Sequence, residues 1–203
     1  MNRSRKMAQR RRGDELKNAI FEATVEILEN KGFEEVTFQN VARKAHTTRS
    51  VLYRYFEDTF QLIYQAARYH VERDERYEGS VIEQVFNTGA LRSDLLAMLS
   101  FMRDNSTRFP KNFLPYIFFE QAQGKNFFEG TVGDITENNL IIIERILARA
   151  QERGEARENI KQETKLISFK LSRYNIMLTG KAMSDEQIIE LVDDVLIPLY
   201  MKN

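Results

Sequence analysis

The chain has 203 residues, with 30 Lys and Arg against 30 Asp and Glu, so its formal net charge is zero. It has no cysteine and two histidines, which excludes thiol catalysis, iron–sulfur clusters and cysteine–zinc sites and leaves little basis for a histidine-built metal site. No apolar run approaches the roughly 20 residues of a membrane span, and no apolar signal-peptide core follows the basic start, so a soluble, cytoplasmic protein is expected.

The first twelve residues are strongly basic. They contain no acidic residue, and their bases are Arg3, Arg5, Lys6, Arg10, Arg11 and Arg12. Such a run is typical either of a solvated tail or of an arm that follows a phosphate backbone by displacing counterions, and the two interpretations are compatible. We therefore expect residues 1–13 to form a basic flexible arm.

Helical periodicity begins after this arm. Apolar residues recur at helical spacing between positions 16 and 28, and Gly32 follows where a left-handed helix C-cap is expected. Two short helices come next. Thr37 is the expected cap of the first of them, and Thr48 starts the second.

The later elements are also predicted from apolar spacing. Asp58 is a candidate cap for a long fourth helix, which we expect to run as far as Gly79 or Gly89. Further helical stretches follow, and Ser184 with Gln187 forms a capping box at the start of the last one. No stretch alternates apolar and polar residues for long enough to predict a strand. The sequence therefore predicts an all-α protein of about nine helices.

Residues 37–56 carry the strongest functional signal. A short helix, a tight turn at residues 45–47 and a second short helix follow the helix-turn-helix plan, in which the second helix enters the major groove by its N-terminal end. Thr48 supplies a side-chain oxygen at the start of that helix and leaves backbone N–H groups for a phosphate. Arg49 lies on its first turn, where it can contact guanine or a phosphate, and Leu52 anchors the helix inward.

This stretch resembles the TetR family of bacterial transcriptional regulators. The residues that match the family pattern at its spacing are Gly32-Phe33, Thr37, Val41-Ala42, Ala45-His46-Thr47-Thr48 and Leu52-Tyr53-Arg54-Tyr55-Phe56. The likeness is specific from Ile20 to Leu62 and looser over the remaining helices. It implies a three-helix DNA-binding domain at residues 14–60 and a helical effector-binding and dimerisation domain at residues 61–203. It further implies a homodimer that binds a palindromic operator, most simply as a repressor, and is released by a small molecule.

The expected DNA contacts are hydroxyl and guanidinium groups, which donate to phosphates and base edges. They are Thr37, Thr47, Thr48, Arg49, Ser50, Tyr53, Arg54, Tyr55 and Thr59.

Two positions depart from the family pattern. His46 stands in the turn where the family usually has Gly, and a non-glycine residue with positive φ costs roughly 1–2 kcal/mol. Thr59 stands where the family usually has a Lys that reaches a phosphate. The absence of that charge weakens binding and its salt dependence, and the basic arm is expected to compensate. The departures leave one alternative open, a helical ligand-sensing or interaction protein with a degenerate, non-specific DNA-binding module.

Aromatic residues and methionines are dense in the second half of the chain. The resemblance places an effector cavity among these helices, so some of these residues are expected to line a pocket for a small apolar or aromatic effector. Ordinary core packing is the alternative for each of them. The expected lining is Met98, Phe101, Met102, Phe113, Tyr116, Phe119, Tyr174 and Met177.

The last two helices carry apolar stripes that are wider than one face needs. The surplus predicts a two-fold four-helix interface between two copies, and burial in the chain's own core is the alternative. The interface residues that this pattern predicts are Leu166, Ile167, Leu171, Ile188, Val192, Val195 and Leu199.

Nothing in the sequence predicts an enzyme. It contains no metal-ligand spacing, no glycine-rich phosphate loop and no catalytic set of Ser, His and Asp. Carboxylates such as Glu152, Glu155 and Glu158 fall on charged helical faces. We therefore expect no catalytic activity and no cofactor or metal, and the expected partners are double-stranded DNA, an effector and a second copy of the chain.

Overall fold

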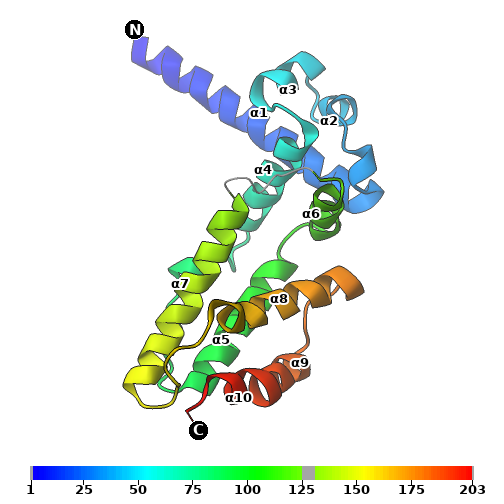
Figure 1. The fold of residues 1–203 in the computed structure, drawn as a ribbon. Helices are drawn as coiled ribbons and strands as arrows, with labels where there is room; N and C mark the ends of the chain where they lie inside the picture. The colour runs from blue at the N-terminus through cyan, green and yellow to red at the C-terminus, as the bar shows by residue number, and fades with distance from the viewer. Residues whose placement is uncertain (1, 125–130, 203) are drawn as a thin grey trace. The chain divides into compact units, whose positions relative to one another are not determined.

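The structure, a computed structural model, describes residues 2–124 and 131–202, with the backbone alone for residues 2–12 and 131–134. Within these residues it contains α-helices, short 3-10 and π segments and one isolated bridge between Ala156 and Met201, which confirms the all-α fold. The helices up to α8 (Figure 1) are α1 (Asn2–Lys31), α2 (Phe38–Lys44), α3 (Arg49–Tyr55), α4 (Thr59–Glu72), α5 (Leu91–Thr107), α6 (Phe113–Ala122), α7 (Thr131–Glu152) and α8 (Gln162–Thr179).

The last helix is continuous but irregular. It consists of α9 (Asp185–Glu190), a π-helical segment (Leu191–Leu196) and α10 (Ile197–Tyr200), and with these counted as one the described residues form nine α-helices. The expected capping box opens it: the Ser184 hydroxyl accepts a hydrogen bond from the Gln187 amide at 3.3 Å, and the Gln187 side chain accepts one from the Ser184 amide at 3.0 Å.

The chain divides into two compact units. The first contains the chain up to Tyr77 together with Arg108–Ile117, and the second contains Glu78–Thr107 and the chain from Phe118 onward. The first unit is thus built from two separate stretches of sequence. Its second stretch ends inside α6, so the start of this helix belongs to the same unit as α1 to α4.

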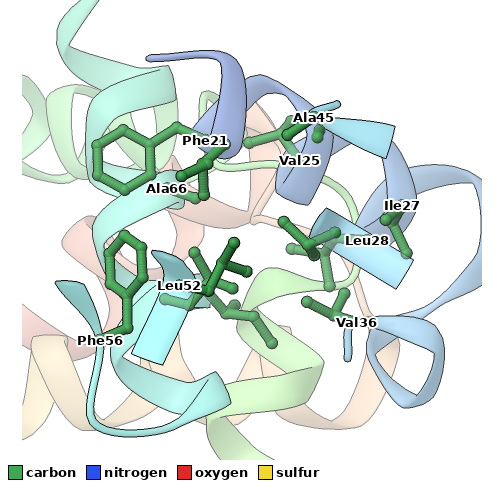
Figure 2. Packing of buried hydrophobic residues seen from close by; sticks show 14 of the residues in the cluster. Phe21, Val25, Ile27, Leu28, Val36, Ala45, Leu52, Phe56 and Ala66 are labelled. Atoms are coloured by element: carbon green, nitrogen blue, oxygen red, sulfur yellow. The ribbon is translucent and has the colours of Figure 1, made fainter. Parts of the chain in front are cut away.

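The core of the first unit lies between α1, α2, α3 and α4. Leu52 is 0% exposed and Phe56 is 2% exposed, and they meet apolar side chains of α1 such as Phe21 and Leu28 (Figure 2). Near the end of α4, Arg73 donates a hydrogen bond to Glu22 of α1 at 2.8 Å. Burying the Leu52 side chain contributes about 1.5–3 kcal/mol relative to leaving it in water, so this core fixes the position of α3.

The N-terminal arm differs from the sequence-based expectation. The backbone of α1 is helical from Asn2, through Gly13, to Lys31, where a flexible arm was expected for residues 1–13. Arg, Met, Ala and Gln, which make up most of this stretch, are good helix formers, and one internal Gly costs only about 1 kcal/mol relative to Ala. The side chains of the arm lie outside the described part of the structure.

The helix α4 is shorter than predicted. It ends at Glu72, and not at Gly79 or Gly89, because a local turn replaces the helix after it. In this turn the Asp74 carboxylate accepts hydrogen bonds from the Arg76 amide at 2.9 Å and from the Arg76 guanidinium at 2.6 Å. The Arg76 contacts hold the pKa of the Asp74 carboxyl well below its usual range. Asp side chains that bond to nearby backbone groups compete with helix formation.

The second unit has its own apolar core between α5, α7, α8 and the last helix. Phe169 and Tyr200 are both 0% exposed, and the Tyr200 hydroxyl donates to the Thr164 carbonyl at 3.0 Å. Burial raises the pKa of Tyr200 well above its ordinary value. In the described residues no helix is both long and apolar enough to cross a membrane.

Charged side chains form hydrogen bonds at the N-terminal end of α5, within the second unit. Asp94 is 0% exposed and accepts hydrogen bonds from the Thr88 amide at 2.6 Å and from Arg153 at 3.3 Å. Glu155 accepts one from the first amide of α5, that of Leu91, at 2.6 Å. The bond from Arg153 lowers the pKa of the Glu155 carboxyl. These contacts tie α5 to the end of α7 and give the carboxylates a structural role.

Candidate nucleic-acid interface

The first helix of the candidate interface is α2. Its cap is Thr37, as expected, whose hydroxyl accepts a hydrogen bond from the Asn40 amide at 3.1 Å. Val41 is 0% exposed and Ala42 is 3% exposed, so this face of α2 packs against the core of the first unit. The small side chain of Ala42 lets the helices approach closely.

The turn after α2 uses an unusual backbone conformation. His46 has a φ of 51°, and the Thr47 amide donates to the Ala42 carbonyl at 2.9 Å, which closes the end of the helix. His46 therefore occupies the left-handed region in which glycine is favoured. This conformation costs the folded state roughly 1–2 kcal/mol. The turn still forms and directs the chain into α3.

The helix α3 separates buried and exposed side chains. Leu52 faces the core, and Phe56, the C-cap residue, is buried beside it. Tyr53 is 58% exposed and Tyr55 is 44% exposed. The other exposed candidates on or beside α3 are Thr48, Arg49, Ser50 and Arg54, whereas Thr47 is half-buried. The structure thus brings the predicted contacts of α3 onto the surface of one short helix.

Thr48 begins α3, as expected. It is the N-cap residue of α3, but its side chain makes no capping hydrogen bond. Its hydroxyl instead lies 3.0 Å from the Ser50 hydroxyl. The Thr48 carbonyl accepts a hydrogen bond from the Val51 amide at 3.1 Å. The Thr48 side chain leaves the Arg49 and Ser50 amides for another acceptor, such as a phosphate oxygen.

The start of α4 carries an acidic cap beside Thr59. Asp58 is the N-cap, as expected, and its carboxylate accepts a hydrogen bond from the Gln61 amide at 2.7 Å. Thr59 is half-buried as the first residue of the helix. A phosphate near Thr59 would meet the Asp58 carboxylate as well as the hydroxyl, which makes Thr59 the weakest of the predicted contacts.

The structure adds one candidate that the sequence analysis missed. Arg43 is exposed near the end of α2, and its guanidinium donates a hydrogen bond to the Asn40 side chain at 3.0 Å. Asn40 is in turn fixed by a bond to the Glu35 carbonyl at 2.9 Å. The first helix of a helix-turn-helix crosses the DNA backbone, so a basic residue in its last turn was a signal that could have been used.

The expected pocket residues are divided between the two units. Phe113 and Tyr116 are buried in the core of the first unit, where Tyr116 lies against Phe33 with ring centroids 5.2 Å apart. In the second unit Met98 is 0% exposed, and Phe101 and Met102 are half-buried beside it in the same core. The exposed members of the set are Phe119, Tyr174 and Met177.

The expected dimer residues also separate into two groups. Leu166, Ile188 and Val192 are 5%, 2% and 0% exposed, so the chain's own core buries them, which was the alternative to a contact with a second copy. The remaining four, which are half-buried, are Ile167, Leu171, Val195 and Leu199. The structure exposes other apolar side chains near them, namely Tyr174, Met177 and Leu178 on α8 and Ile189 on α9.

The capped α2, the strained turn and the half-exposed α3 form the helix-turn-helix of a DNA-binding protein. Residues 20–65 match the family model described as bacterial regulatory proteins, tetR family. The "DNA-binding transcriptional repressor TetR" of Mycobacteroides abscessus is 24% identical over 188 residues, which cover 93% of this chain and 95% of the relative. These matches support the resemblance to the TetR family. They support a transcription regulator with a DNA-binding helix-turn-helix.

Solved structures share the fold. One is SmeT, the repressor of the Stenotrophomonas maltophilia multidrug efflux pump SmeDEF, at 17% identity and a TM-score of 0.54, covering 92% of this chain and 91% of that chain. Another is a TetR-family transcriptional regulator from Mesorhizobium loti, at 14% identity and a TM-score of 0.54, covering 92% of this chain and 97% of that chain. At these identities the likeness extends to the arrangement of helices.

Proposed function

We propose that this regulator binds a palindromic operator as a homodimer, that it represses transcription there and that a small apolar or aromatic effector releases it. The proposal of DNA binding rests on the two faces of α3. Leu52 is buried and anchors the helix, whereas Arg49 and Tyr53 are exposed. An exposed recognition helix behind a tight turn is the geometry that enters the major groove. The repressor role is supported by the name of the relative from M. abscessus.

Each proposed function is assigned to one segment of the chain. Residues 14–60 contact DNA, residues 1–13 add charge, and residues 61–203 bind the effector and the second copy. The apolar side chains on α8 support the dimer: Ile167, Leu171, Tyr174 and Leu178 are spaced by four, three and four residues, so they lie on one helical face, and two of them are exposed. This surface replaces Leu166, Ile188 and Val192 as the proposed partner contact.

The effector is proposed to bind inside the second unit. Phe101 and Met102 are half-buried beside Met98, and the Phe101 ring lies 6.0 Å from that of Phe86. Flexible methionines beside aromatic rings suit an apolar ligand. Phe113 and Tyr116 are not included in the proposed lining, because they are buried in the core of the first unit.

Replacing Arg49 with alanine is expected to weaken binding to the preferred operator by about 1–3 kcal/mol and to relax the base preference at one position of each half-site. Binding is measured against fragments that the purified protein selects from genomic DNA. The matched control is Arg68→Ala, which removes an exposed arginine of α4 that pairs with Glu72 at 2.8 Å. An equal loss on every sequence would assign Arg49 to a phosphate, and an unchanged affinity would remove it from the interface. A wild-type protein that selects no sequence would favour the alternative of a degenerate module.

The basic arm is expected to supply much of the salt dependence. Replacing its six bases with glutamine should lower affinity and flatten the dependence of log affinity on log salt by about 0.9 for each phosphate that the arm no longer neutralises. Glutamine is used because it preserves the helix-forming tendency of the arm. Titrations at several salt concentrations measure both quantities, and an unchanged slope would show that the arm binds no phosphates.

A further inference from the structure

Arg49, at the start of α3, contacts Tyr53 on the same helix. Its guanidinium donates a hydrogen bond to the Tyr53 hydroxyl at 3.2 Å, and its Cζ atom lies 5.8 Å from the centroid of the Tyr53 ring. The two residues are one helical turn apart, so their side chains meet without distortion of the backbone. Within the described part of the chain, no carboxylate forms an ion pair with Arg49.

Tyr53 is itself fixed from the other side. Its ring meets the ring of Phe38 edge to face, with centroids 4.7 Å apart and an interplanar angle of 74°. Phe38 is the first residue of α2 and is 6% exposed, so it is part of the core of the first unit. The contacts therefore run from a core residue of α2, through an exposed tyrosine of α3, to the arginine at the front of that helix.

This arrangement acts on the conformational freedom of Arg49. A long arginine side chain loses rotamer entropy when it binds, and a contact that already restricts the side chain in the free protein lowers that cost. The Tyr53 hydroxyl accepts the bond from Arg49 through a lone pair and keeps its own proton for another acceptor. Tyr53 can thus restrict Arg49 whether or not it also contacts DNA.

We propose that Tyr53 is a positioning residue that sets base preference by holding Arg49 in the orientation that contacts a base edge. This proposal rests on the proposed function, because it assumes that Arg49 contacts a base. It differs from the expected role of Tyr53 as a phosphate contact, which would affect all DNA sequences alike. It also assigns Phe38 a role in recognition through the ring that it supports.

The test compares Tyr53→Phe, Arg49→Ala and the double variant on the selected operator, on its single-base variants and on random duplex. Tyr53→Phe keeps the ring against Phe38 and removes only the hydroxyl. We expect it to weaken operator binding roughly two- to tenfold, to flatten the preference at the position that Arg49 contacts, and to weaken binding to random duplex less than binding to the operator. In the Arg49→Ala background it should have no further effect on base preference, because the two residues act as one unit.

Tyr55→Phe is the matched control, since Tyr55 is an exposed tyrosine of the same helix whose ring lies 6.3 Å from that of Phe56. Any reduction in affinity that it causes should be the same on every sequence. Two results would overturn the proposal: a Tyr53→Phe loss that is equal on all DNA and additive with Arg49→Ala, or no loss at all. A wild-type protein without sequence preference would instead overturn the proposed function, so the two failures are distinguishable.

Discussion

Replacing Leu52 with alanine is expected to lower the stability of the first unit by about 2–5 kcal/mol and to abolish specific DNA binding. Leu52 is 0% exposed, and its side chain is the apolar anchor of α3 in the core formed with α1, α2 and α4 (Figure 2). The truncation leaves a cavity under the recognition helix. Amide hydrogen exchange over residues 20–65 measures the effect, because the chain has two compact units and a single unfolding transition need not describe both.

Leu52→Met is the control for this experiment. It preserves most of the buried volume, so a cost below about 1.5 kcal/mol is expected and DNA binding should survive. If Leu52→Ala left exchange in α3 unchanged, the helix would not depend on this anchor and the account of its position would be wrong.

Replacing Tyr116 with alanine is expected to destabilise the first unit by about 3–5 kcal/mol, although Tyr116 is far from most of that unit in sequence. Tyr116 is 3% exposed, and its ring contacts Phe33 at 5.2 Å and Phe60 at 6.0 Å between centroids. The start of α6 is also fastened to α1, because the Asn112 side chain donates to the Leu28 carbonyl at 2.9 Å. Faster amide exchange in α1 and α4 is the expected result.

The control is Phe119→Ala, one turn further along α6. Phe119 is 44% exposed and belongs to the second unit, so its removal should leave exchange over residues 20–65 close to that of the wild type. Equal effects of Tyr116→Ala and Phe119→Ala on these amides would contradict the inclusion of residues 108–117 in the first unit.

Local signals predicted the helix-turn-helix well. Thr37, Asp58 and Ser184 cap the helices that the sequence assigned to them, since a cap needs only its own side chain and an amide three residues later. The positive φ of His46 was likewise anticipated as a condition of the turn. The hydrogen-bond partner of the Thr48 hydroxyl could not be predicted. The choice between an amide of α3 and the Ser50 hydroxyl depends on a rotamer that the sequence does not specify.

Contacts distant in sequence could not be predicted in this way. An apolar stripe on a helix shows that a face is buried but not by which partner, so Leu166 and Val192 were assigned to a second copy when the chain's own core buries them. Phe113 and Tyr116 were assigned to a ligand pocket because the family resemblance places a cavity among these helices, and the sequence did not indicate that the core of the first unit buries them. Nothing local in residues 108–117 indicates that this stretch completes the core of a unit whose other residues end at Tyr77.

The most direct test of the account is a structure of the full chain bound to a duplex that it selects from genomic DNA. We expect two copies, with both α3 helices in successive major grooves about 34–36 Å apart and the Arg49 guanidinium at a base edge beside the Tyr53 hydroxyl. A complex in which α3 faces away from the duplex and Arg49 stays in solvent would contradict it.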